Sequence, residues 1–148
     1  MTNAKNRTAF NEKMAQLMKL STESMALMIL DINNLKQVND QYGHHEGDQM
    51  IINTCHCIFN AFNEIGEVYR IGGDEFVVLM LNRPEDLTVY LNRLEQLIQS
   101  FNADHPHPIS LAYGCAVGSN QIDIENLFKQ ADKNMYQCKF DQKSHSGL

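Results

Sequence analysis

The sequence is most informative at Tyr69-Arg-Ile-Gly-Gly-Asp-Glu-Phe-Val-Val-Leu-Met80. Apolar residues lead into two glycines, two carboxylates follow at once, and five apolar residues complete the run. This order predicts a hairpin of two strands, Glu67 to Ile71 and Glu75 to Leu81, closed by a tight turn. We expect Gly72 and Gly73 to adopt backbone angles that a Cβ would forbid and to let another backbone or a ligand approach closely.

Two adjacent acids, Asp74 and Glu75, follow the glycines. Carboxylate oxygens are preferred ligands of hard cations such as Mg²⁺, which in turn bind phosphates. The pattern therefore favours a metal and phosphate site at the mouth of a sheet. An ordinary hairpin with solvated acids at its tip fits the same residues, and the hairpin alone leaves both interpretations open.

A third strand is predicted at Met25-Ala-Leu-Met-Ile-Leu30, which is apolar on both faces. Such a run suits a central strand, although its periodicity also fits a buried helical segment. Asp31 is expected just beyond the end of this strand. If the strand neighbours the hairpin, Asp31 and Asp74 come within metal-bridging distance.

Helical periodicity accounts for most of the remaining chain. The predicted helices span Asn6 to Leu20, Leu35 to Tyr42, Gly47 to about Asn63, Pro84 to Phe101 and Ile124 to Lys139. We expect Asp48 in the first turn of the third helix, and a strand from Ile109 to Val117 that Gly114 interrupts. Helices and strands thus alternate around one sheet with the Gly-Gly hairpin in its middle, which predicts an α/β or α+β sandwich.

Composition bounds the possible partners. A chain of 148 residues fits one domain, and 12 basic against 18 acidic residues give a net charge of −6. This charge disfavours a broad nucleic-acid-binding face. No run approaches the ~20 apolar residues of a membrane span, so we expect a cytoplasmic domain without a membrane segment.

The cysteines and the histidines of the segment Asp104-His-Pro-His-Pro108 are not expected to be functional. The four cysteines form no C-x-x-C pair, so we interpret them as reduced thiols, mostly in the core. Metal binding at Cys55-His56-Cys57 is the weaker alternative. His105 and His107 are predicted to lie on the surface.

Two long motifs carry a family resemblance: Asp31-Ile-Asn-Asn-Leu-Lys-Gln-Val-Asn-Asp-Gln-Tyr-Gly-His-His-Glu-Gly-Asp48 and Arg70-Ile-Gly-Gly-Asp-Glu-Phe76. At this separation they closely resemble the GGDEF family of diguanylate cyclases. The likeness covers nearly the whole chain, because Met1 to Arg7 resembles the family's entry motif and Ala131 to Lys139 its final helix. It implies one GGDEF domain over residues 1–148, with the palm-like fold of nucleotide cyclases, a central and mostly antiparallel sheet flanked by helices.

The resemblance also implies an enzyme that condenses two GTP molecules into cyclic di-GMP with release of pyrophosphate. Two divalent ions, Mg²⁺ or alternatively Mn²⁺, would activate the 3′-hydroxyl and neutralise the triphosphate. Carried over by position, Asp31 and Asp74 would be metal ligands, and the backbone carbonyl of Ile32 would complete the shell. Glu75 would assist at the metal and hydroxyl, and whether it or Asp74 accepts the proton stays open.

Asn39 and Asp48 match the family's guanine readers. A carboxylate can accept from guanine N1–H and N2–H₂ while an amide donates, whereas adenine would leave Asp48 unpaired, which favours GTP over ATP. Three lysines and two backbone positions would meet the phosphates; these are Lys36, Lys139, Lys143, Asn34 and Leu35. A solvated helix surface is the alternative for the lysines.

This chain departs from the family pattern at several positions. Asn33 replaces the usual second acid of the first motif, and we expect this to matter little because the first acid, Asp31, is the metal ligand. Lys143 replaces a usual Arg, and the loss of the two-pronged guanidinium predicts weaker phosphate binding. The family's product-inhibition motif, R-x-x-D, corresponds here to Asn63-Glu-Ile-Gly66, so feedback inhibition through this site is expected to be lost. We also expect a catalytic domain excised from a larger signalling protein, with a stand-alone gene product as the alternative.

Catalysis in this family is expected to need a transient homodimer, because each of two antiparallel domains holds one GTP. The main alternative is a catalytically silent GGDEF module that binds GTP or a partner protein and regulates an attached domain. A cyclic di-GMP receptor is disfavoured by Asn63 and Gly66. An enzyme for another nucleotide is disfavoured by Asn39 and Asp48.

Overall fold

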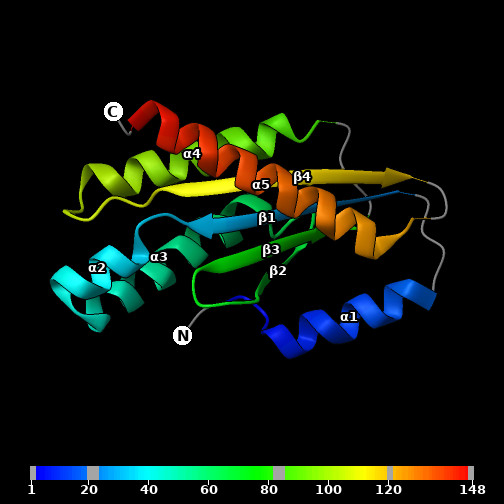
Figure 1. The fold of residues 1–148 in the computed structure, drawn as a ribbon. Coiled ribbons are helices and arrows are strands. Elements are labelled where there is room, and N and C mark those ends of the chain that lie inside the picture. The colour runs from blue at the N-terminus through cyan, green and yellow to red at the C-terminus, as the bar shows by residue number, and fades with distance from the viewer. Residues whose placement is uncertain (1–2, 20–23, 82–85, 120–121, 147–148) are drawn as a thin grey trace.

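The computed structural model describes residues 3–19, 24–81, 86–119 and 122–146. The elements, labelled in Figure 1, are α1 Arg7–Lys19, β1 Ser24–Ile32, α2 Leu35–Tyr42, α3 His44–Phe62, β2 Glu67–Arg70, β3 Glu75–Met80, α4 Thr88–Ala103, β4 Leu111–Ser119 and α5 Ile124–Ser146. The strands form one antiparallel sheet in the order β2-β3-β1-β4. The predicted α+β fold with an antiparallel sheet is confirmed.

β1 is the central strand that its apolar run predicted. Its even-numbered apolar side chains pack with α2, α3 and α4, whereas its odd-numbered ones pack with α1 and α5. Since successive side chains of a strand point to opposite faces, an uninterrupted apolar run indicates a core on each side of the sheet. The sheet is therefore covered on both faces, with α5 lying along β4 in Figure 1.

Two predictions about the sheet are wrong in detail. Asp31 lies inside β1 instead of beyond it, because β3 and β4 both continue to pair with β1 at this position, through Glu75 and Ala112. The Gly-Gly hairpin does not lie in the middle of the sheet, since its first strand, β2, is an edge strand. Only β3 of the hairpin is central.

The turn of the hairpin does not depend on special glycine angles. Among the described glycines, only Gly43 has a positive φ. A Cβ at Gly72 would make an ordinary contact of 3.5 Å with Glu75 Cβ, and one at Gly73 would meet nothing within 4 Å. Instead, the Arg70 guanidinium donates to the carbonyls of Gly72 and Gly73 at 3.2 and 3.0 Å and holds the turn from one side.

α3 begins earlier than predicted, at His44 instead of Gly47. Gly43, with φ of 93°, lets the chain pass from α2 into α3 without a longer loop. Asp48 consequently lies beyond the first turn of α3, and the prediction that placed it there is wrong. The predicted helix start at Pro84 lies outside the described residues.

Gly114 does not interrupt its strand, because β4 pairs with β1 continuously across it. A Cβ at this position would lie 2.1 Å from the backbone nitrogen of Met135 and 2.5 Å from the carbonyl oxygen of Ala131. The glycine therefore lets the backbone of α5 lie directly on β4. α5 itself continues past the predicted end at Lys139 to Ser146.

The remaining expectations concern cysteines and membranes. The four cysteines form no disulfide in this structure, and Cys55 and Cys57 are buried whereas Cys115 and Cys138 are partly exposed. Over the ranges that the structure describes, no helix combines the length and the apolar character that crossing a membrane requires.

Candidate active site

Acids from distant parts of the sequence meet where β1 ends beside the hairpin. Asp31 of β1 lies directly opposite Glu75 of β3. The N–H of Ile32 donates to the carbonyl of Asp74 at 2.8 Å, which joins the end of β1 to the turn. The two strands are thus neighbours, as the sequence predicted.

The Asp31 carboxylate is buried and only partly hydrogen-bonded. It is 6% exposed, and its Oδ2 accepts a hydrogen bond from Lys139 Nζ at 2.6 Å. Its Oδ1 is buried and has no hydrogen-bond partner within the described part of the chain. A buried carboxylate oxygen without a partner is costly, so this atom is suited to receive a ligand.

Burial and mutual repulsion perturb the acids of this site. Burial raises the pKa of Asp31, and the neighbouring Asp74 adds to the increase, while Lys139 opposes it. Burial also raises the pKa of Glu75, with repulsion from Asp31, Asp132 and Asp74 in support. We call Asp31, Asp74, Glu75 and Asp132 the acid cluster. Such perturbed carboxylates gather at functional sites, and they favour an added proton or cation.

Lys139 provides the counter-charge for this cluster. Burial tends to lower the pKa of Lys139, but the hydrogen bond and charge of Asp31 outweigh it, so the net shift is upward. The ammonium group therefore stays charged beside Asp31. In this structure Lys139 contacts Asp31, a predicted metal ligand, and its phosphate contact stays a prediction.

The acid cluster is not arranged as a finished metal site. Within the described ranges, no group of three or more His, Cys, Asp or Glu side chains lies in an arrangement that could hold a metal ion. The chemistry of the donors nevertheless fits a hard divalent cation, because every side-chain donor is a carboxylate oxygen and Asp31 Oδ1 has no other partner. Mg²⁺ and Mn²⁺ both prefer such oxygen ligands.

The start of α2 follows directly after β1. Asn34, at the N-cap, has φ of 66° in the left-handed region, and its side chain makes no capping hydrogen bond. Non-glycine residues in this region are strained by about 1 kcal/mol or more and are common at ligand sites. The first N–H groups of α2, including those of Leu35 and Lys36, have no acceptor inside the helix, which is the usual setting for anion binding.

The other predicted phosphate-binding lysines are exposed. Lys36 lies on α2 and Lys143 on the last part of α5. Neither makes a hydrogen bond or ion pair with another residue of the described chain. Their positions leave both interpretations open, phosphate contact and solvated helix surface.

Three residues of the site were missed or undervalued in the sequence. The side-chain amide of Asn33 donates to Ser110 Oγ at 3.0 Å and to Gln142 Oε1 at 2.8 Å, which ties the end of β1 to α5. A carboxylate could not donate these bonds, so the departure from the usual acid carried a signal. Arg70 holds the turn, and Asp132 joins the acid cluster only because α5 folds back over the sheet.

The two predicted guanine readers lie on the adjoining helices α2 and α3. Asn39 is half-buried on α2, and Asp48 is exposed on α3. The Asn39 side chain lies against Gly47, where its Oδ1 is 1.6 Å from the position that a Cβ would take. The structure thus brings Asn39 to the residue immediately before Asp48.

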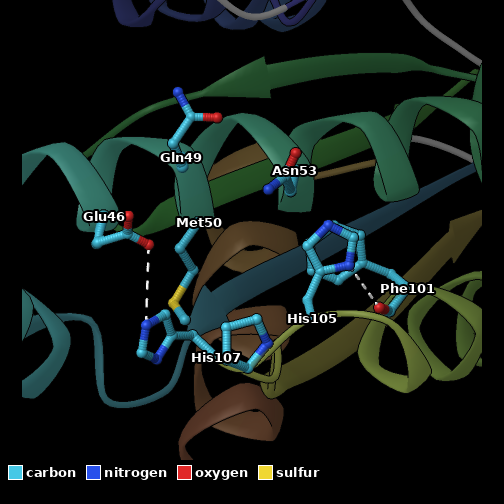
Figure 2. A pocket seen from close by; sticks show the side chains of 8 residues that line it. Glu46, Gln49, Met50, Asn53, Phe101, His105 and His107 are labelled. Atoms are coloured by element: carbon cyan, nitrogen blue, oxygen red, sulfur yellow. Dashed lines mark hydrogen bonds and ion pairs between the residues drawn. The ribbon is translucent and has the colours of Figure 1, made fainter.

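A separate pocket of about 270 Å³ lies between α3 and the segment after α4 (Figure 2). Its lining contains none of the predicted site residues; the lining residues are Glu46, Gln49, Met50, Asn53, Phe101, His105, Pro106 and His107. The ring of His105 stacks on that of Phe101 with 3.7 Å between the ring centroids, and its Nδ1 donates to the backbone carbonyl of Phe101 at 2.8 Å. It is exposed, as predicted.

His107 is less exposed than the sequence suggested. Its ring lies 4.1 Å from the ring of Tyr42, and its Nε2 is 3.9 Å from Glu46 Oε2, as the dashed line in Figure 2 marks. The side chain is 25% exposed, so His107 lies at the surface, as predicted, but is partly covered. Packing against α2 and α3 accounts for its burial.

Comparison with known proteins agrees with this architecture. A family model described as "Diguanylate cyclase, GGDEF domain" matches residues 1–145. The diguanylate cyclase DgcS of Shewanella oneidensis is 33% identical over 116 residues, which cover 78% of this chain and 39% of that protein. The diguanylate cyclase DgcN of Escherichia coli is 30% identical over 146 residues, which cover 94% of this chain and 36% of that protein.

A solved structure gives the same result for the fold. It is a microbial GGDEF domain described in a novel interaction mode with cyclic di-GMP, and it is 28% identical with a TM-score of 0.75. The alignment covers 95% of this chain and 90% of that one. The chain spans less than two fifths of the length of the two curated relatives above, so the comparison concerns one domain of each. With the family model matching nearly its full length, the chain belongs to the GGDEF domain family.

Proposed function

We propose that this domain is a diguanylate cyclase that condenses two GTP molecules into cyclic di-GMP. In each of two steps a 3′-oxygen attacks the α-phosphorus of the other GTP, and a pyrophosphate leaves. The observation that carries the proposal is the acid cluster, in which Asp31 Oδ1 is buried without a partner beside the start of α2. The names of the relatives support it, since several are diguanylate cyclases.

Asp31, Asp74 and the backbone carbonyl of Ile32 would hold a divalent cation, Mg²⁺ or Mn²⁺. When bound, the cation would make the 3′-hydroxyl more acidic and neutralise charge on the triphosphate. Burial raises the pKa of Glu75, which makes its carboxylate a stronger base, and this residue lies opposite Asp31. Glu75 is therefore a candidate proton acceptor in this proposal, beside Asp74.

Lys139 has two successive roles in this proposal. Without nucleotide, its ammonium group neutralises Asp31 at 2.6 Å. With Asp31 holding a divalent cation, Lys139 would be free to contact the triphosphate. Lys36, Lys143 and the N–H groups at the start of α2 would complete the phosphate contacts.

Guanine would be read by Asn39 and Asp48. The exposed Asp48 carboxylate can accept from N1–H and N2–H₂, and the Asn39 amide can donate to the purine. Adenine offers no matching donor pair, so the site would prefer GTP.

We further propose that the domain lacks product inhibition through the R-x-x-D position. Gly66 stands where the family has Asp, and a Cβ there would lie 2.8 Å from the carbonyl oxygen of Leu79. Packing against β3 thus disfavours any side chain at this position. Asn63 stands where the motif has its arginine, so the position also lacks the cation that would pair with the phosphates of cyclic di-GMP.

The test is incubation of concentrated protein with GTP and Mg²⁺, with cyclic di-GMP detected by mass spectrometry. Asp74→Asn should remove the product, whereas the exposed Asp104→Asn should retain it. No product, even from protein fused to a dimerising coiled coil, would contradict the proposal. GTP binding by calorimetry without turnover would favour the silent regulatory module instead.

A further inference from the structure

Two glycines four residues apart connect α2 to α3, and they are needed for different reasons. Gly43 has φ of 93°, but a Cβ there would meet nothing within 4 Å. Its requirement is therefore the backbone angle. Gly47 has no such angle, but a Cβ there would overlap the side chain of Asn39, so its requirement is space.

A glycine at position 47 lowers the stability of α3, which suggests that another requirement keeps it there. It lies in the first turn of α3, where glycine is less favourable than alanine because the unfolded chain has more freedom to lose. The three atoms nearest its missing Cβ all belong to Asn39: Oδ1 at 1.6 Å, Cγ at 2.7 Å and Nδ2 at 3.3 Å. No residue with a Cβ can share this space with Asn39 in its present conformation.

The backbone between these residues leaves little room for adjustment. The N–H of Gly43 donates to the carbonyl of Asn39 at 2.9 Å, and the N–H of Gly47 donates to the carbonyl of Gly43 at 3.3 Å. These bonds hold residue 39 and residue 47 at a fixed separation. A Cβ at residue 47 would therefore move the Asn39 side chain instead of separating the helices.

We propose that Gly47 is a positioning residue for nucleobase recognition, because it leaves the space in which the Asn39 amide is held beside Asp48. The recognition part of this inference rests on the proposed function, in which Asn39 and Asp48 read guanine. The packing part stands on the geometry alone. Gly47 itself contacts no substrate in this account.

A double-mutant cycle tests the packing part. Gly47→Ala and Asn39→Ala are made singly and together, and urea unfolding midpoints are measured for all four proteins. In the Asn39 background, Gly47→Ala should lower the midpoint. In the Asn39→Ala background it should leave the midpoint unchanged or raise it, because only the helix preference of alanine remains.

Gly43→Ala is the matched control for this cycle. Its cost comes from the backbone angle, so it should lower the midpoint equally with and without the Asn39 side chain. A Gly47→Ala effect that is the same in both backgrounds would overturn the inference. The double variant keeps this test available even if Gly47→Ala alone folds poorly.

The recognition part is tested by binding of GTP and ATP to the folded variants with Mg²⁺ present. Gly47→Ala should weaken GTP binding about tenfold, the order expected for one lost hydrogen bond, and should reduce the preference for GTP over ATP. In the Asn39→Ala background the same change should have no further effect. If the effect of Gly47→Ala on the unfolding midpoint depends on Asn39 but the preference for GTP over ATP is unchanged, the recognition part is overturned. If the unmodified protein does not bind GTP, the proposed function itself is overturned.

Discussion

Asp31 is the residue on which the site depends. One carboxylate oxygen is paired with Lys139, and the other is buried without a partner in the described chain. Repulsion from the neighbouring Asp74 and Glu75 further destabilises the ionised form of Asp31. The folded domain thus keeps a local instability at the place where a cation and a nucleotide would relieve it.

Replacement of Lys139 by Met should destabilise the domain by about 2 kcal/mol, because it leaves a buried carboxylate without its counter-charge. The expected destabilisation is moderate because Lys139 is 25% exposed and because Asp31 can take up a proton, which removes its unpaired charge. Urea unfolding at neutral pH measures it. Lys143→Met, on an exposed part of α5, serves as the control and should change stability little. Addition of Asp31→Asn should restore most of the loss, and a stable Lys139→Met protein would show that the ion pair contributes nothing.

Glu75→Gln should stabilise the domain at neutral pH. The pKa of Glu75 is raised in the folded state, so folding favours its protonated form and stability is lost as the pH rises through the folded-state pKa. The amide removes this loss, and its advantage should vanish at acidic pH, where the glutamate is protonated in both the folded and the unfolded states.

Unfolding midpoints from about pH 3 to about pH 8 measure the effect of Glu75→Gln. The exposed Glu12→Gln of α1 is the control and should follow the unmodified protein. A Glu75→Gln protein that is less stable at neutral pH would contradict the account.

At the scale of elements, two glycines of the sheet region differ in how closely their surroundings pack against them. Gly114 allows the backbone of α5 to lie on β4, while Gly73 at the hairpin tip has open space around it. The first glycine therefore serves packing. The second contributes nothing visible to packing, which is consistent with a role in ligand approach.

Gly114→Ala should destabilise the domain by about 2 kcal/mol or more, because its Cβ would collide with backbone atoms of α5 that cannot rotate away. Gly73→Ala should change the unfolding free energy by less than about 0.5 kcal/mol. The same Gly73→Ala protein should lose GTP affinity if the nucleotide approaches the turn. Thermal unfolding and calorimetry measure both, and equal stability losses at the two positions would contradict this distinction.

Most elements of the fold could be predicted from periodicity, and the errors have common physical causes. The run from Met25 to Leu30 predicted a central strand because both of its faces meet a core. Periodicity could not indicate that strand pairing extends β1 through Asp31. Nor could it indicate that Gly114 makes room for the backbone of a helix 17 to 21 residues away in sequence. Both features depend on partners that are distant along the chain.

At the scale of the whole molecule, the site is assembled from four separate parts of the chain. The end of β1, the β2–β3 turn, the α2–α3 pair and the face of α5 that carries Asp132 and Lys139 contribute to it. The motifs indicated the acids and the proposed nucleobase readers. They could not indicate the Lys139–Asp31 pair, because it depends on the packing of α5, or the closeness of Asn39 to Gly47, which depends on the turn at Gly43.

Added cyclic di-GMP should not inhibit the domain through the surface at residues 63–66. Gly66 is confined by β3, and Asn63 stands where the motif has its arginine. The measurement is the initial rate of pyrophosphate release with increasing cyclic di-GMP. Saturable inhibition that excess GTP does not relieve would contradict this prediction.

The most direct test of the central claim is the initial rate of cyclic di-GMP formation over a dilution series of the protein, at saturating GTP and Mg²⁺. Because each domain is proposed to hold half of the reaction centre, the rate per mole of protein should rise with concentration and then level off. Asp74→Asn should give no product at any concentration. A complete absence of product, or a rate per mole that stays constant while light scattering reports a monomer, would contradict the account.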